Sequence, residues 1–296
     1  MKRVTKVLGV IALIAMAALS SAYGQQFSPE RDFRVAPEAG GASIRIVEYI
    51  GDSWTVRIPP RIRNLPVTHI GEDAFRDKNL TSVTIPDTVT HIGHRAFSRN
   101  QLTSVIIPNS VTHIGSLAFA SADIDQNLRP IPIGNPITNV TIGNRVTHIG
   151  AGAFRGAPLT SITIPNSVTY IGELAFWHGQ LTSVTIGNGV TSIGEQAFAH
   201  NQLTSVVIPN SVTSIGNEAF VGNRLTSVII PNSVTNIGGG AFESNQLASI
   251  TIGSGVMFGI GFQTMGSDWN FLTSYESNGR LAGTYTFADG DWTHQP

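Results

Sequence analysis

Apolar and polar residues alternate along short stretches of this chain, and the alternation returns at a fixed interval. Residues 80–85 read LTSVTI and residues 102–107 read LTSVII, so that Ser and Thr separate inward-facing apolar positions. A two-residue period of this kind is typical of a half-buried β-strand. Pro86 ends the first stretch because proline has no amide hydrogen to donate to a sheet. Val89 and Ile92 then predict a second extended segment before the pattern restarts.

A nearly constant interval defines eight copies of one unit. One Phe recurs in every copy, at Phe75, Phe97, Phe119, Phe154, Phe176, Phe198, Phe220 and Phe242. Successive Phe residues are 22 residues apart, except for the interval of 35 residues from Phe119 to Phe154. A unit this short cannot bury its own apolar residues, so neighbouring units must stack and share a core. The sequence therefore predicts an elongated, β-rich solenoid. We expect a monomer with one continuous parallel ladder of the segments around Val83, Val105 and their equivalents.

One position in every copy is Gly, as at Gly93 and Gly194. An unvarying Gly indicates either a positive φ or a close approach of another backbone. After it, Ala96 and Phe97 are expected to close the unit inward as a short helical or 3₁₀ turn.

The full pattern, L-x-x-V-x-I-P-x-x-V-x-x-I-G-x-x-A-F-x-x-N, resembles the BspA-like (Treponema-type) leucine-rich repeat over residues 67–256. The chain departs from the family's frequent Cys near the end of each unit, where it has Asn100, Asn201, Asn223 and Asn245. The resemblance implies a secreted or surface bacterial protein that binds host or neighbouring macromolecules. It implies no shared catalytic site.

Both ends of the array carry sequences suited to capping an open sheet. Residues 25–66 are expected to form an N-terminal capping hairpin, with strands in 43–60 joined at Gly51 and Asp52. Residues 257–296 are expected to form an aromatic cap with a second hairpin at Asn278-Gly279. Ligand binding by these aromatic residues is the alternative.

Residues 1–24 have the composition of a secretory signal peptide. Lys2, Arg3 and Lys6 precede an apolar run from Val7 to Leu19, followed by small residues. Its removal would leave 15 basic and 19 acidic residues, a net charge of about −4. We therefore expect an exported chain, secreted, periplasmic or on the cell surface, with no nucleic-acid partner and no membrane insertion after cleavage. The chain has no Cys, so packing alone must stabilise it.

Few residues have the spacing of a catalytic or metal site. His69, His91, His113 and His148 share one repeat position, but a straight column does not converge on one ion, so a packed or exposed ladder is expected. Asp123, Asp125 and Asn127 begin like a calcium loop but lack its later Gly and Glu. No nucleophile motif is present, and we expect neither catalytic residues, nor metal, nor cofactor.

The outward side of the first strand is the candidate binding surface. It carries small hydroxyl residues with occasional apolar ones, and the candidates are Ser82, Thr84, Ser104, Ile106, Ser205, Val207, Ser227 and Ile229. Strand propensity and solubility are the alternative explanation for this composition. The hypothesis is a repetitive contact surface for an extended protein or glycan.

The long interval between Phe119 and Phe154 contains an excess segment, residues 122–134, that the repeat does not need. Removing it brings Asn135 into the position that Asn201 holds in its own copy, so the excess is interpreted as a loop extruded from an intact unit. Asp123, Asp125 and Arg129 in this loop are further binding candidates, although a tolerated insertion without a role is the alternative. Its deletion is expected to leave the melting temperature nearly unchanged.

These features together predict a non-enzymatic extracellular module that recognises a host or neighbouring-cell macromolecule through its repeat surface. A structural scaffold of the cell envelope is the alternative, and an accessory role toward polysaccharide is a third hypothesis.

Overall fold

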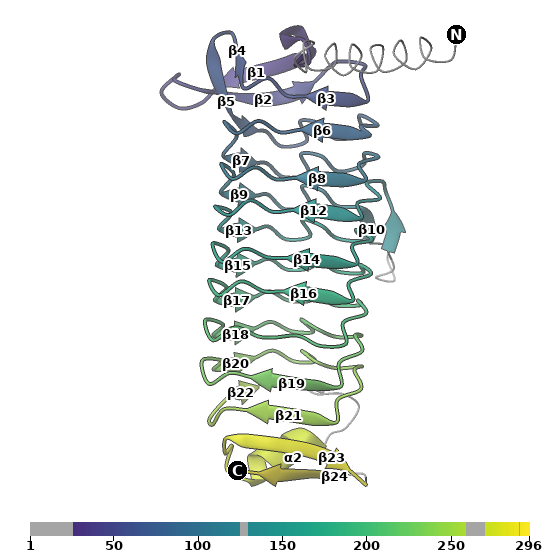
Figure 1. The fold of residues 1–296 in the computed structure, drawn as a ribbon, viewed down its shortest axis with the longest axis vertical. Helices are drawn as coiled ribbons and strands as arrows, with labels where there is room; N and C mark the ends of the chain where they lie inside the picture. Colours follow the sequence, from purple (N-terminus) through teal and green to yellow (C-terminus); the bar gives the residue numbers. More distant parts are fainter. Residues whose placement is uncertain (1–25, 125–129, 259–269, 290) are drawn as a thin grey trace, which may run out of the picture.

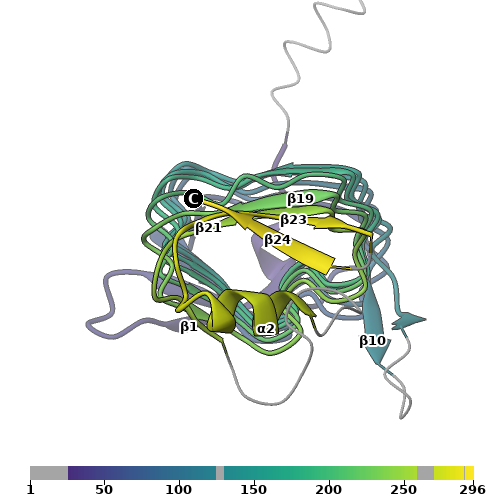
Figure 2. The same ribbon diagram turned by 90° about the horizontal axis from the view of Figure 1, so that it is seen from below.

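The computed structural model describes residues 26–124, 130–258, 270–289 and 291–296, and the expected signal peptide lies outside these ranges. The chain forms an elongated solenoid whose rungs stack along one axis, with the two ends of the array far apart (Figure 1). Seen along that axis, successive rungs nearly superimpose (Figure 2), so the faces of the solenoid are close to flat. The predicted β-solenoid is confirmed.

One side of each rung contributes a two-residue strand to a continuous parallel ladder, here called the His–Ile ladder. It belongs to a sheet of twelve strands that also includes the N-terminal strands. Equivalent residues pair directly, for example His91 with His113 and Ile92 with Ile114. Its repeat strands are β7 (His91–Ile92), β9 (His113–Ile114), β13 (His148–Ile149), β15 (Tyr170–Ile171), β17 (Ser192–Ile193), β18 (Ser214–Ile215), β20 (Asn236–Ile237) and β22 (Met257–Phe258).

The segments around Val83 and Val105 do not form the continuous ladder that the sequence predicted. They form separate small sheets, β3 with β6, β8 with β12, β14 with β16, and β19 with β21. The residues at 205–208 have no strand assignment. The strands are β3 (Thr55–Arg57), β6 (Ser82–Thr84), β8 (Ser104–Ile106), β12 (Asn139–Thr141), β14 (Ser161–Thr163), β16 (Ser183–Thr185), β19 (Ser227–Ile230) and β21 (Ser249–Ile252).

The corner after each of these strands explains where the pairing breaks. Three of the four pairs have Gly at the corner of their second rung, namely Gly143, Gly187 and Gly253. A Cβ at Gly187 would collide with the carbonyl group of Pro165 in the preceding rung, so Gly permits the close approach that pairing needs. Rungs with Pro at this corner are not paired with the rung before them. The pair β3–β6, with Pro at both corners, is the exception.

The core is one apolar cluster that runs through all rungs and is centred on a column of stacked Phe rings. Ring centroids from Phe75 to Phe242 lie 4.9–5.6 Å apart, and Tyr49 extends the stack by one ring. Offset stacking of this kind contributes about 0.5–1.5 kcal/mol per pair beyond the burial itself. Each added rung therefore buries the exposed Phe face of the one before it.

The Asn residues that replace the family's Cys stabilise the corner that leads into each new rung. The Asn201 amide donates to the carbonyls of Phe176 and Phe198 at 2.8 and 3.0 Å. Its Oδ1 accepts from the Leu181 amide at 3.1 Å, which joins two rungs. A buried amide is tolerated here because backbone partners satisfy it.

The Gly position does not have a positive φ; close backbone approach is the correct explanation. A Cβ at Gly194 would lie 2.7 Å from the Glu173 amide nitrogen and 2.8 Å from the Ile171 carbonyl oxygen. The positive φ values fall two residues later, as at Gln196 (51°). The segment around Ala96 and Phe97 is accordingly a series of turns rather than the expected helix.

The N-terminal hairpin is formed by other residues than expected. The 3₁₀ turn η1 (Glu30–Asp32) leads into β1 (Phe33–Pro37), which pairs antiparallel with β2 (Ile44–Tyr49). The predicted partner of β2, the strand β3, pairs with β6 on another side of the rung. Strands β4 (Arg61–Ile62) and β5 (Leu65–Ile70) complete the first rung, and β2 continues the His–Ile ladder through β5. The way the rungs stack decides that β3 pairs with β6 and not with β2. The local turn residues Gly51 and Asp52 carry no information about that stacking.

At the C-terminal end, helix α2 (Asn270–Ser277) and strands β23 (Gly283–Ala288) and β24 (Asp291–Gln295) close the solenoid (Figure 2). Asn278-Gly279 is not a hairpin turn: Gly279 has φ +66° and ends α2, as Gly commonly does. The hairpin connects β23 and β24 instead. Phe271, Tyr275, Tyr285 and Trp292 are buried and join the core.

Replacing Gly194 by Val should lower the free energy of unfolding by about 3 kcal/mol, because its side chain would force two rungs apart. Chemical denaturation measures the change. Thr163→Val, which keeps a β-branched side chain and replaces its hydroxyl by a methyl group at an exposed position where another rung has Val207, is the control and should be near neutral. Equal stability of the two variants would contradict the close-approach explanation.

Candidate functional site

The exposed side chains of strands β3, β6, β8, β12, β14, β16, β19 and β21 and of residues 205–208 form a continuous surface, here called the Ser–Thr face. The strand period directs Ser82 and Thr84 of β6 outward, and the same register holds in later rungs. The candidates Ser82, Thr84, Ser104, Ser205 and Ser227 are exposed, and no hydrogen bond joins their hydroxyl groups to the described part of the chain. Their hydroxyls are therefore available to a partner.

Large apolar side chains interrupt this hydroxyl surface at a few rungs. Ile106, Val207 and Ile229 have 70%, 79% and 66% of their surface exposed. Val207 and Ile229 lie on adjacent rungs and border a groove of about 570 Å³ that continues to Thr251 and Gly283. Exposed apolar residues of this size beside polar ones are a common feature of interaction surfaces. The structure thus brings four of the predicted residues, Ser205, Val207, Ser227 and Ile229, together around one groove.

Sequence reasoning missed Trp54 at the top of the same surface. Trp54 is 64% exposed, and the pairing of Thr55 with Ser82 places it one rung above β6. Trp54 and the equivalent Thr81 are further apart in the sequence than the 22-residue repeat. Counting back from Thr81 by one repeat therefore does not reach Trp54. Strand alternation could not have revealed it, because Trp54 has the parity of the buried Val56 and Ile58 and is exposed only because it precedes β3.

The described parts of the insertion, residues 122–124 and 130–134, project from a rung that is intact, as the loop interpretation predicted. Strand β13 pairs with β9 across it, and the Asn135 amide donates to the Phe97 carbonyl at 2.7 Å, as the other corner Asn residues do. Strands β10 (Ala122–Ile124) and β11 (Pro130–Pro132) form an antiparallel hairpin on the flank of the solenoid (Figures 1 and 2). Asp125 and Arg129 lie outside the described residues.

Asp123 of this hairpin contacts the solenoid itself. The Arg155 guanidinium, 8% exposed as a residue, donates to Asp123 Oδ1 at 2.9 Å and to the Ala122 carbonyl at 3.0 Å. Burial lowers the pKa of Arg155, and the Asp123 carboxylate opposes that shift. The two contacts anchor the base of the hairpin, so its deletion cannot be neutral for the solenoid without a change at Arg155.

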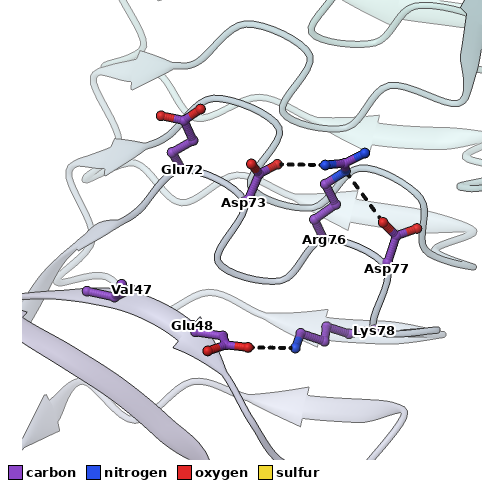
Figure 3. Close-up of a pocket in the computed structure, with 7 residues that line it drawn as sticks. All are labelled: Val47, Glu48, Glu72, Asp73, Arg76, Asp77 and Lys78. Carbon is purple, nitrogen blue, oxygen red and sulfur yellow. Dashed lines mark hydrogen bonds and ion pairs between the residues drawn. The ribbon is translucent and has the colours of Figure 1, made fainter.

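A hollow at the N-terminal end is lined by charged residues, which pair with one another (Figure 3). Arg76 lies between Asp73 and Asp77 at 3.7 and 3.5 Å, and Lys78 contacts Glu48 at 3.3 Å. The lining has four carboxylates and two basic side chains, and Arg95 lies beside Glu72 and Asp73 as a third cation. Exposed pairs of this kind contribute little stability, and a small excess of negative charge remains.

The predicted histidine column is present on the His–Ile ladder. Neighbouring rings among His69, His91, His113 and His148 stack with centroids 4.5–5.0 Å apart and planes within 9°. Burial lowers the pKa of both His91 and His113, and the adjacent imidazoles lower it further. Among the described residues, no three His, Cys, Asp or Glu side chains converge on a point where a metal could bind.

The repeat, the Phe stack and the two kinds of strand define a leucine-rich repeat solenoid. The family described as "BspA type Leucine rich repeat region" matches in six copies over residues 63–132 and 133–258, which is more than half of the chain. The chain belongs to this family. BspA-type repeats occur in bacterial surface proteins and are typically non-enzymatic.

Two solved structures are similar to this chain. A leucine rich cell surface protein from Faecalibacterium prausnitzii A2-165 is 27% identical, with a TM-score of 0.55, and the match covers 83% of this chain and 73% of that one. The T. pallidum leucine rich repeat protein TpLRR is 21% identical, with a TM-score of 0.40, over 81% and 85% of the two chains. No curated protein matches the chain.

Deleting residues 122–134 should lower the free energy of unfolding by about 1–3 kcal/mol, because Arg155 loses its carboxylate and carbonyl partners. Adding Arg155→Ala to the deletion should recover most of the loss, since Ala199 occupies this position in another rung. Thermal unfolding of the two variants tests this. Equal melting temperatures for the deletion and the full chain would show that the anchoring contacts contribute nothing.

Stability should decrease as the pH falls below about 6.5, the ordinary His value. The lowered pKa of His91 and of His113 means that the unfolded chain binds protons that the folded chain resists, so acid favours unfolding. Between about pH 7.5 and pH 5 we therefore expect the melting temperature to fall, as thermal unfolding at the two pH values would measure. The double substitution His91→Asn, His113→Asn should flatten the dependence. His178 and His200 also have a lowered pKa, mainly from burial, and should account for part of the remainder.

Proposed function

We propose that this chain is a non-enzymatic binding module, exported to the bacterial cell surface, that recognises a macromolecule through its Ser–Thr face. The observation that carries the proposal is the exposure of Ile106, Val207 and Ile229 among the small hydroxyl residues of the Ser–Thr face. An apolar side chain at these positions contributes nothing to the core, which the inward residues of the same strands already fill. Contact with a partner would remove these apolar side chains from water, which explains why they are apolar.

The groove between Val207 and Ile229 is the proposed centre of contact. Binding energy concentrates where apolar residues can be fully desolvated, while the surrounding polar rim excludes water. Here Ser205 and Ser227 provide that rim, with Asn210 and Asn232 at the corners. Trp54 is the second proposed anchor because Trp is enriched among the residues that dominate binding.

Family membership supports the proposed location. BspA-type repeats occur in bacterial surface proteins, and the F. prausnitzii relative is itself described as a cell surface protein. In the described ranges, no helix has the length and hydropathy needed to cross a bilayer. The charged, apolar and small-residue order of residues 1–24 supports export as well.

The double substitution Val207→Ser, Ile229→Thr, with small hydroxyl residues like those of other rungs, should weaken binding about tenfold or more. The measurement is surface plasmon resonance against immobilised purified extracellular-matrix proteins, beside extracts of the bacterial envelope. Tyr170→Ser, which removes an exposed aromatic ring from the His–Ile ladder, is the control and should bind like the full chain.

Unchanged binding by the double variant would exclude the Ser–Thr face as the contact surface. Retention by envelope extracts alone, with no matrix protein bound, would instead favour a structural scaffold of the cell envelope. Exposure of the protein to protease added to intact cells tests the proposed location independently of any ligand.

A further inference from the structure

The histidine column lies on a different face from the proposed contact surface and has its own chemistry. Its four residues occupy one position on successive strands β5, β7, β9 and β13, and each pairs in register with the next. They form a single file because every rung contributes one imidazole. His113 and His148 are exposed, and His69 and His91 are half-buried.

A hydrogen-bond relay sets the tautomer of these rings. The Thr90 hydroxyl donates to the Thr68 carbonyl of the preceding rung at 3.1 Å, so its oxygen accepts from His91 Nδ1 at 2.8 Å. A hydroxyl has one proton, and that proton is already committed. With the hydroxyl proton directed at the Thr68 carbonyl, the neutral imidazole carries its hydrogen on Nδ1 and leaves Nε2 unprotonated.

The same relay recurs at the next two rungs. Thr112 donates to the Thr90 carbonyl at 3.1 Å and lies 2.9 Å from His113 Nδ1. Thr147 donates to the Thr112 carbonyl at 3.0 Å and lies 2.9 Å from His148 Nδ1. Within the described chain, no hydrogen bond is made at Nε2 of His91, His113 or His148. Protonation at Nε2 thus adds a charge and an outward donor without breaking the bonds that hold the ring.

Different side chains lie at the two ends of the histidine column. At the N-terminal end, Glu38 Oε1 lies 3.7 Å from His69 Nδ1 and accepts a hydrogen bond from Arg45 at 2.7 Å. Arg45 lowers the pKa of the Glu38 carboxyl, so this end stays anionic beside a cation. At the other end, Tyr170 tilts by 49° against His148. Acid therefore converts His91 and His113, which lie between these ends, from neutral to cationic rings.

We propose that the histidine column is a pH-dependent binding site for a linear acidic polysaccharide, engaged under mildly acidic conditions and released near neutrality. Stacked imidazolium groups repel one another, and a row of carboxylates or sulfates opposite them removes that repulsion. One acidic group per repeating unit suits a row with one charge per rung. Later rungs continue the column with Ser192, Ser214 and Asn236, whose uncharged side chains suit sugar hydroxyls.

The chain as a whole disfavours a denser polyanion. Its formal net charge is −1 with neutral His, and Arg45, which pairs with His69 in the ladder, forms an ion pair with Glu38. Nucleic-acid sites instead have clustered Lys and Arg. Protonation of the column therefore adds positive charge that Arg45, already paired, does not supply.

The test measures binding of polygalacturonate, a linear carboxylate polymer, to the full chain at about pH 5 and at about pH 7.5, on either side of the ordinary His pKa. We expect binding about tenfold tighter at the lower pH, weakened by added salt and accompanied by proton uptake in calorimetry. Neutral dextran should not bind. His91→Asn, His113→Asn should abolish the pH dependence, and Asn is compatible with the ladder because Asn236 holds the same position.

The matched control is His178→Asn, His200→Asn. It removes the same number of ionisable groups from turns on another face, at positive-φ positions that Asn tolerates. It therefore separates the column from the general rise in positive charge below the pI of about 6.7. Thermal unfolding at about pH 7.5 checks that both variants fold.

Three results would overturn the proposal. The column variant could bind polygalacturonate as tightly as the full chain at the lower pH. The control variant could lose as much affinity as the column variant, which would show a net-charge effect only. A single-stranded oligonucleotide could bind in preference to polygalacturonate, which would assign the column to another class of polyanion.

Discussion

In-register stacking is the constraint on which the rest of this structure depends. A rung contributes roughly one turn of chain, and its Phe, Leu, Val and Ile residues become buried only when another rung covers them. The Phe column shows the result, with rings 5.1–5.6 Å apart and nearly parallel from Phe97 to Phe242. Any feature that changes the distance between rungs therefore affects the whole array, and the repeated backbone contacts at the Gly position protect that distance.

Stacking also explains how polar residues can lie inside. Each corner Asn bonds backbone groups of two successive rungs, and each Thr hydroxyl of the His–Ile ladder donates to a carbonyl of the preceding rung, so both connect the units. The same connectors have a consequence on the surface. Because the Thr hydroxyl commits its proton to the preceding rung, it fixes the orientation and tautomer of the histidine beside it.

The Ser–Thr face and the His–Ile ladder differ because their strands pair differently. The His–Ile ladder is continuous, so its side chains stand in one uninterrupted row at a nearly constant spacing. The Ser–Thr face is divided by the Gly and Pro corners into pairs of rungs, with an unpaired segment at 205–208. A groove bordered by Val207 and Ile229 lies at this interruption. Regular and irregular stacking thus produce a linear array on one face and a local depression on another.

The sequence by itself determined the solenoid, the inward and outward residues, the extruded position of 122–134 and the histidine column, because each follows from a period that local chemistry imposes. Hydrophobic alternation and the constant interval between copies leave no other way to bury Phe97 or Ile92. Only the tertiary structure decided which strands pair, that Gly194 is required by a neighbouring rung, that Asp123 anchors to Arg155, and that Asn278-Gly279 ends a helix. These features depend on distances between residues of different rungs, which the linear pattern does not contain. A Gly at a corner, for example, permits its strand to pair with the strand of the preceding rung.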